Sequence, residues 1–376
     1  MKIGRGELTP NFAILQYLTY DWRLKLMLEH RNPSRFQLTS LLLPVFVVLV
    51  VMLNSGCGLL GTKKKITVPQ LLTPLAQESK DRLVQEVNRL STVRSIHGKV
   101  DIQFEDTSFA SFGIADQYRL VDGSLTLQRP GKIYLIIRFT IVDIAQMASD
   151  GEHFSVAVLK GDEKYKRFVR GTNSAVYPRL ETTANHTAPT SDKEKTEKQT
   201  VNALSNLRPQ HLTDAFMIPP IDANNGMTYV QSEFFQEEAD LRRQANKGDR
   251  VMRGYYLLEE ISHQNGDAKM TRRFWFDRVN GVRLARVQTY DDKGSLITDV
   301  SYFDERTIGS GPTASLPSRI VITRPQDQYK LNITYQDATS VDINREFRPK
   351  AFVLENSWQL PEVDLDAQNK KVTANQ

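Results

Sequence analysis

Few side chains in this sequence are arranged for catalysis or metal binding. The chain has one cysteine, so it can form neither an internal disulfide nor a cysteine-based zinc site. Its six histidines show no H-x-H or H-E-x-x-H pattern and no carboxylates at ligand spacing; they are His30, His97, His153, His186, His211 and His263. No G-x-S-x-G, S-x-x-K or glycine-rich phosphate loop is present. We therefore expect neither an enzyme nor a metal cofactor.

The single cysteine, Cys57, follows a short apolar run. Residues 41–53 read LLLPVFVVLVVML, which is shorter than the roughly 20 residues of a membrane-spanning helix and about as long as the apolar region of a signal peptide. Arg31 and Arg35 precede the run and supply the positive charge typical of such a signal. We therefore interpret residues 1–56 as an export leader, with translation starting at Met27 as an alternative to Met1.

The residues around the cysteine suggest a lipid anchor. Ser55 and Gly56 precede Cys57, and this segment resembles a bacterial lipoprotein signal, although Asn54 stands where leucine is usual. The resemblance implies that the Cys57 thiol receives a diacylglycerol and that its new amino group receives an acyl chain. The other interpretation is a free, buried cysteine behind an uncleaved anchor. Two or more acyl chains would hold the protein on a membrane without spanning it.

The net positive charge of the chain is concentrated in this leader. Residues 1–56 hold six of the 49 basic and three of the 44 acidic residues, which leaves 43 and 41 for the remainder. The remainder is nearly neutral, so we expect no nucleic-acid partner. Residues 57–72 form a predicted lipidated tether. Its lysines, Lys63 to Lys65, are placed either to contact anionic headgroups or to solvate the tether.

The remaining sequence is typical of a mainly β protein. Thr73-Pro74 supplies an N-cap residue and a proline at the first helical position, which predicts an amphipathic helix at about 74–92. From Lys99 the apolar residues alternate with polar ones, as in a strand with one buried face. Asn265-Gly266 and Asn280-Gly281 separate further alternating runs and indicate hairpins. We expect about eleven antiparallel strands.

Four less regular segments interrupt or follow these strands. Residues 181–200 lack large apolar side chains, which predicts a polar insertion, and residues 236–250 predict a second exposed excursion. Residues 201–217 predict a helix broken near Pro209, and 361–376 a flexible tail. The domain itself is expected to span 73–360.

The order of several motifs is similar to that of a known family. After the lipoprotein-type signal and the helix come RLSTVRS (89–95), the strand 98–104, GSLTLQRPGK (123–132), SDG (149–151), LRP (207–209), the strand 273–277 and LPSRI (316–320). This order, over about residues 73–356, resembles the LolA/LolB-type lipoprotein carriers of the Gram-negative envelope. The resemblance implies an α+β fold, an open antiparallel half-barrel whose concave apolar face is covered by helices and receives acyl chains.

Candidate binding residues follow from the alternating strands. The predicted trough comprises Val100, Ile102, Phe104, Leu125, Leu127, Tyr134, Ile136, Phe154, Val156, Phe274, Phe276, Leu331, Ile333 and Tyr335. Ordinary core packing is the alternative for each, because alternation cannot distinguish a face that meets side chains from one that meets lipid. Members of this family that are membrane-anchored insert an apolar loop, for which Ile141, Val142 and Ile144 are the candidates; strand core is their other interpretation.

These observations lead to two functional hypotheses. The first is a non-enzymatic lipoprotein on the periplasmic face of the outer membrane that binds acyl chains or lipoproteins as cargo and assists their transport or insertion. The second is a structural lipoprotein whose polar loops dock an envelope protein complex. Neither requires a cofactor beyond the lipid on Cys57.

Overall fold

The computed structural model describes residues 68–107, 116–117, 120–161, 163–177, 180, 205–222, 224–264 and 266–374. The chain divides into two compact units, Met1–Val68 and Pro69–Gln376, and the account below concerns the second. The leader, Cys57, most of the tether and the polar insertion 181–200 lie outside the described residues. Among the helices of the described part, none has the length and apolarity needed to cross a bilayer.

The described chain is mainly β, as predicted. Its strands are β1 (Gln70–Leu71), β2 (Ser95–Asp106), β3 (Asp116–Gln117), β4 (Val121–Gln128), β5 (Lys132–Phe139), β6 (Val142–Asp150), β7 (His153–Val158), β8 (Arg167–Thr172), β9 (Thr228–Ala239), β10 (Arg250–Gln264), β11 (Asp267–Asp277), β12 (Arg283–Tyr290), β13 (Leu296–Ile308), β14 (Ala314–Arg324), β15 (Tyr329–Tyr335), β16 (Asp342–Ile343) and β17 (Glu362–Asp364). Its helices are α2 (Lys80–Ser91), α4 (Pro209–Phe216) and α5 (Leu365–Ala374), with 3₁₀ turns η3 (Glu163–Tyr165), η4 (Ala338–Ser340) and η5 (Pro349–Phe352).

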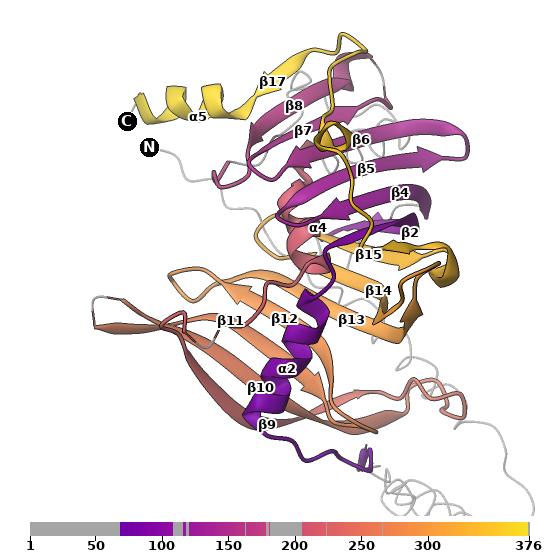
Figure 1. Cartoon of the computed structure of the whole chain (residues 1–376), viewed down its shortest axis with the longest axis vertical. Coiled ribbons are helices and arrows are strands. Elements are labelled where there is room, and N and C mark those ends of the chain that lie inside the picture. Colours follow the sequence, from indigo (N-terminus) through magenta and orange to yellow (C-terminus); the bar gives the residue numbers. More distant parts are fainter. Residues whose placement is uncertain are drawn as a thin grey trace, which may run out of the picture. The chain divides into compact units, whose positions relative to one another are not determined.

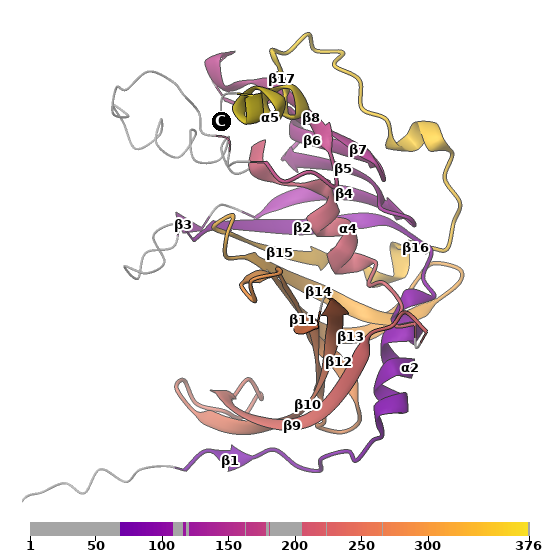
Figure 2. The same cartoon turned by 90° about the vertical axis from the view of Figure 1, so that its left-hand side faces the viewer.

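All of these strands belong to one open sheet. Strands β9 to β15 pair in chain order, β15 pairs with β2, and β2 leads through β4 to β8, always antiparallel. The parallel strand β17 extends the sheet beyond β8, and β1 adds a short parallel pairing to β10. Among the described strands, no pairing joins β9 to β8 or β17, so the sheet does not close (Figures 1 and 2). The open half-barrel expected from the sequence is confirmed.

One face of this sheet carries the main apolar core, and we call it the core face. Helix α2 buries Leu83, Val87 and Leu90 in that core, and α4 contributes Leu212 and Ala215. Both helices therefore cover apolar side chains that the strands present at every second position. The sheet alone would leave this face exposed to water, so the helices are part of the stable fold.

The first helix starts later than the sequence suggests. The Leu72 N–H donates to the Met252 carbonyl at 2.9 Å, and the Ala76 N–H donates to the Arg278 carbonyl at 2.8 Å. Because β10 and the residues after β11 take these backbone groups, the segment runs extended and the helix begins only at Lys80. The prediction of a helix start at Thr73-Pro74 was wrong.

Two other segments also differ from or refine the prediction. Residues 236–239 are the end of β9, and only 240–249 form the exposed connection to β10. Helix α4 begins at Pro209, the position of the expected break, with the proline in its first turn.

The segment beyond Pro361, treated above as a tail, contains β17 and α5. Before it, the chain crosses the face opposite the core, where Leu354 packs with Ala148, Ala157 and Phe168 in a smaller apolar cluster. The sheet is thus covered on both faces around β5 to β8.

Candidate functional site

Most of the predicted trough residues lie together on the core face. Twelve of the fourteen belong to the main apolar cluster or, for Phe104, pack against it. The helices cover this face, so these side chains contact protein rather than an open cavity. The structure therefore brings them together as a continuous apolar surface beneath α2 and α4.

Tyr134 and Ile136 are the two exceptions. Leu125 pairs with Leu135, and directly opposed residues share a face, so Leu135 points to the core and its two neighbours point away. Tyr134 packs in the smaller cluster on the opposite face. The predicted phase of this strand was wrong because residues 133–137 are all apolar or aromatic, which leaves no alternation to read.

An open pocket of about 460 Å³ lies beside α4, and we call it the α4 pocket. Its apolar wall is formed by residues of α4, of the segment after it and of strands β12 and β13, among them Ala215, Ile218, Val287, Val300 and Tyr302. Its size is in the range of small-molecule sites. None of the fourteen predicted trough residues lines it, although several of its apolar residues belong to the same core cluster.

The polar wall of the α4 pocket contains an arginine with an unusual environment. The Arg208 guanidinium lies over the rings of Phe154 and Tyr177, with its central carbon 5.4 and 5.7 Å from their centroids. Its Nη1 donates to the Ser205 carbonyl at 3.0 Å, and among the described residues no carboxylate forms an ion pair with it. Burial lowers the pKa of Arg208, yet an arginine side chain stays charged in proteins.

Two further titratable groups, both on α4, line the same pocket. Burial raises the pKa of Asp214 to about 6, against the opposing charges of Arg324 and Arg272. Its side chain is exposed but faces the pocket, whose walls reduce its hydration and so favour the neutral carboxyl. Burial, followed by the charges of Arg324 and Arg208, lowers the pKa of His211 well below 6.5. This histidine is therefore neutral near pH 7.

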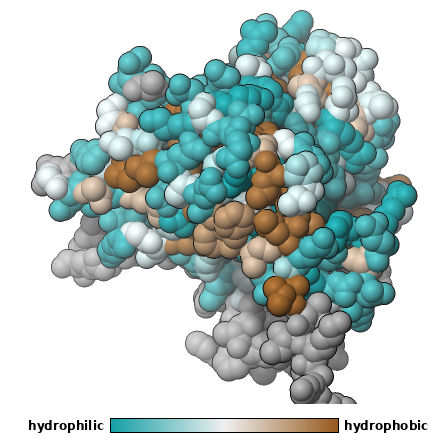
Figure 3. All heavy atoms as spheres, turned by 90° about the horizontal axis from the view of Figure 1, so that it is seen from below, coloured by the Kyte–Doolittle hydropathy of each residue, from teal (hydrophilic) through white to brown (hydrophobic). Residues whose placement is uncertain are grey.

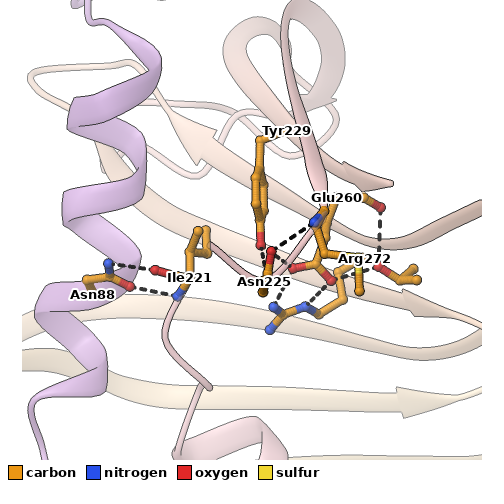
Figure 4. A network of polar contacts seen from close by, with 8 residues as sticks. Asn88, Ile221, Asn225, Tyr229, Glu260 and Arg272 are labelled. Atoms are coloured by element: carbon orange, nitrogen blue, oxygen red, sulfur yellow. Dashed lines mark hydrogen bonds and ion pairs between the residues drawn. The ribbon is translucent and has the colours of Figure 1, made fainter. Parts of the chain in front are cut away.

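Arg272, which lines the pocket, forms a buried ion pair with Glu260 (Figure 4). Arg272 donates to the Glu260 carboxylate at 2.9 Å, and the same carboxylate accepts from the hydroxyls of Thr271 and Tyr229 at 2.7 and 2.8 Å. Burial opposes ionisation of Glu260, but these partners, led by Arg272, lower the pKa of its carboxyl. The group is held in one orientation as a satisfied network.

The covering helices are held by a few side chains. Arg129 donates to the carbonyls of Val93, Met217 and Ile218 at 2.8, 3.0 and 3.0 Å, which ties the ends of α2 and α4 to the turn after β4. Asn88 on α2 exchanges two hydrogen bonds with the backbone of Ile221, at 2.7 and 3.0 Å (Figure 4). These contacts link both helices to each other and to the sheet.

The loop between β5 and β6 carries the candidate membrane residues. Ile141 and Val142 are 88% and 61% exposed at a turn in which Thr140 has φ 59°. Phe139 is partly exposed beside them, whereas Ile144 is buried in the core. Strand core is thus excluded for Ile141 and Val142, and Ile144 does not belong to an exposed loop.

A second hollow lies on the face opposite the core, and we call it the hairpin groove. It has a volume of about 640 Å³ and is bounded by the end of the β9–β10 hairpin and by β11 to β13. Tyr255, Trp275 and Phe303 line it together with arginines that have acidic partners: Arg253 with Asp277 at 2.6 Å, Arg250 with Glu237 at 2.9 Å, and Arg286 with Asp299.

The edge strand beside this groove is partly apolar. Val230, Phe234 and Phe235 of β9 are 40 to 45% exposed. Seen from below, the side on which Figure 1 places β9 and β10, the molecule shows apolar residues gathered among hydrophilic ones (Figure 3). An edge strand of this kind is open to contact with another surface.

Sequence reasoning did not identify the polar residues of the α4 pocket. Arg208 and Asp214 belong to α4 and its N-cap, whereas Arg272 lies on β11 and Arg324 on β14, and no spacing rule connects the three elements. The one available signal was LRP (207–209), noted above only for its place in the motif order. Within the described part, no three His, Cys, Asp or Glu side chains are grouped as metal ligands.

Comparison with known proteins finds similar folds but no sequence relative. No family model matches the chain, and no curated protein matches it. Among solved structures, it is similar to a LolA superfamily protein from Nitrosomonas europaea, at 13% identity and TM-score 0.35 over 74% of this chain and 99% of that one.

Two further structures have comparable scores. A DUF1329 family protein from Desulfovibrio piger matches at 12% identity and TM-score 0.35, covering 74% and 96% of the two chains. A domain assigned to outer membrane lipoprotein sorting from Vibrio parahaemolyticus matches at 13% and 0.34, covering 72% and 94%. At these scores the functional proposal below rests on the residues of this chain alone.

Proposed function

We propose that this chain is a lipid-anchored, non-enzymatic carrier at the periplasmic face of the outer membrane, and that it binds acyl chains of lipids or lipoproteins beneath α2 and α4. The observation that carries the proposal is the continuous apolar core face, which is covered by two helices that a few hydrogen bonds hold in place. The α4 pocket, whose apolar residues belong to the same core cluster, is the candidate entrance.

The mechanism is displacement of the helices by an acyl chain. Each buried methylene contributes about 0.8 kcal/mol to the free energy of binding, and the acyl chain replaces helix side chains of similar apolar character. The net free energy of exchange is therefore small, so cargo can move between two such surfaces along a shallow affinity gradient. Two hydrogen-bonding groups must release α4 for this displacement. The Tyr302 hydroxyl donates to the Ala215 carbonyl at 2.9 Å, and the Arg129 guanidinium donates to the backbone at the end of the helix.

The anchor and the apolar turn would place this site near a bilayer. Eleven residues separate Cys57 from Pro69, and a fully extended chain spans at most about 3.6 Å per residue, so the anchored domain stays within about 45 Å of the membrane. Ile141 and Val142, exposed at the tip of the β5–β6 loop, are the side chains available to enter the headgroup region.

Lipid retention by the purified full chain tests the proposal. Protein produced without lipidation should carry acyl lipids that organic extraction and mass spectrometry detect, and after delipidation it should bind a fluorescent fatty acid at about one molecule per chain. A delipidated chain that binds neither fatty acid nor monoacylglycerol would sink the proposal.

The role of the helices can be tested separately. Arg129→Gln removes the guanidinium shared by the ends of α2 and α4, so fatty-acid uptake should accelerate and amide hydrogen exchange in residues 209–216 should rise. Arg306→Gln is the matched control, because Arg306 is an exposed arginine on β13. Equal uptake rates in the two variants would exclude helix displacement as the gating step.

The hairpin groove favours a second candidate function, the docking of an envelope protein. Its aromatic side chains and paired charges resemble the composition of protein interfaces more than that of a lipid site. If docking is the main role, Trp275→Ala should abolish a stable complex in pull-down experiments, whereas Val300→Asn, in the α4 pocket, should leave the complex intact.

A further inference from the structure

We infer that the α4 pocket selects acyl ligands that carry an anionic headgroup, which Arg208 binds while the acyl chain follows the apolar wall. This inference rests on the proposed acyl-binding function and specifies the class of ligand. A carboxylate and a phosphate share the chemistry required, which is a negative charge spread over oxygens that accept N–H bonds.

The first argument is the unused hydrogen-bonding capacity of Arg208. A guanidinium has five N–H donors, and one of them bonds to the Ser205 carbonyl. The other contacts of the group are the faces of Phe154 and Tyr177, which orient the guanidinium plane but accept no conventional hydrogen bond. A buried charge with free donors in a pocket wall is best satisfied by an oxyanion.

The second argument is the contrast with the other arginines of the same pocket. Arg272 is neutralised by Glu260, and Arg324 lies 2.7 Å from Asp327. Among the described residues of the pocket, Arg208 is therefore the arginine with no carboxylate at ion-pair distance, and the charge of Asp327 acts on it only from further away. Arg208 is also the N-cap residue of α4, which places it in the same pocket wall as Asp214 and Ala215 of that helix.

The third argument is that polar and apolar walls belong to one pocket. Arg208 and Tyr177 line it together with Val287, Val300 and Ile218, so a ligand with one charged end and one apolar end can contact both. Asp214 is the opposing charge, and Arg324 and Arg272 lie close enough to act on it. The Asp214 carboxylate disfavours ligands with more than one negative charge, and it should limit the affinity for a ligand with a single negative charge.

The test compares oleate with monoolein, which has the same acyl chain and a neutral headgroup. Delipidated full chain should bind oleate at least tenfold more tightly than monoolein, and Arg208→Gln should reduce oleate affinity by about tenfold or more while changing monoolein affinity less than twofold. Arg208→Lys should recover part of the loss, and Asp214→Asn should tighten oleate binding alone. Arg306→Gln serves as the surface control.

Each other outcome has a defined meaning. Equal affinities for oleate and monoolein, or an equal loss of both in Arg208→Gln, would overturn the headgroup assignment and leave acyl binding standing. Acetate binding as tightly as oleate would overturn it in favour of a simple anion site. Binding of neither lipid would instead refute the proposed function on which this inference rests.

Discussion

The α4 pocket and the hairpin groove are both hollows on the same sheet, but their charges are arranged differently. In the groove, Arg250, Arg253 and Arg286 each have an acidic partner within about 3 Å. In the α4 pocket, Arg208 has none among the described residues, and Asp214 is held there with a raised pKa. These arginines of the hairpin groove are therefore paired with acids, whereas the α4 pocket contains an arginine without a close ion pair.

This difference separates surface stabilisation from ligand binding. Paired surface charges contribute little and need nothing further, whereas an enclosed charge without a partner costs free energy that a ligand can recover. The α4 pocket also continues into the main apolar core, while the groove lies over a small cluster formed by Tyr255, Leu257 and Trp275. We therefore propose the α4 pocket as the site of lipid binding and the groove as a candidate for protein contact.

The largest expected effect on stability comes from breaking the buried ion pair of the α4 pocket. Glu260→Ala leaves Arg272 uncompensated and removes the acceptor of two hydroxyls, so we expect a loss of about 3 to 5 kcal/mol in the free energy of unfolding by urea. Glu237→Ala breaks an ion pair in the groove whose side chains are about half exposed, and should cost no more than about 1 kcal/mol. Similar losses at both sites would remove the distinction between the two hollows.

A smaller effect should depend on pH through Asp214. Its pKa is raised from 3.8 to about 6 in the folded state, so the folded chain holds this proton more tightly than the unfolded chain does. The contribution of the group to stability is therefore highest below about pH 4 and falls as the pH rises to about 6.

Asp214→Asn removes this dependence and supplies the measurement. The variant should be more stable than the unchanged protein at pH 7.5, and the two should coincide below pH 4 in urea unfolding. A difference that is the same at both pH values would mean that Asp214 does not titrate in this window. Asp304→Asn, which removes an exposed carboxylate of the groove, is the matched control substitution.

The smallest effect on stability is expected at the β5–β6 turn. Ile141→Asp changes a side chain that is 88% exposed, so the free energy of unfolding should change by less than about 0.5 kcal/mol. Association of the unlipidated protein with anionic vesicles should nevertheless fall severalfold in a flotation assay. Unchanged vesicle binding would leave the turn without a membrane role.

The alternation of apolar residues predicted most of this architecture. It placed residues such as Val100, Leu125 and Leu331 on a common face, because each lies in a strand where polar residues mark the other face. It failed for Tyr134 and Ile136, where a continuous apolar run hides the phase. In that strand only the pairing with β4 decides which residues point inward.

Other features depend on contacts that are distant in sequence. The segment 70–76 is extended because β10 takes its hydrogen bonds, which no local helix signal at Thr73-Pro74 can reveal. The α4 pocket joins Arg208 to Arg272, Val287 and Arg324, which lie 64 to 116 positions later in the sequence. Neither composition nor spacing indicates contacts between such distant positions, so the strands were predictable and the pocket was not.

The central claim is that acyl chains enter beneath α4, and photo-crosslinking tests it most directly. Delipidated full chain would be loaded with a fatty acid that carries a diazirine near its methyl end, irradiated, digested and mapped by mass spectrometry. We predict labels on residues that line the α4 pocket and not the hairpin groove, and competition by unlabelled oleate; these residues are Ala215, Ile218, Val287, Thr289, Ile297 and Val300. Labelling confined to the hairpin groove around residues 236–241, or labelling that oleate does not displace, would contradict the account.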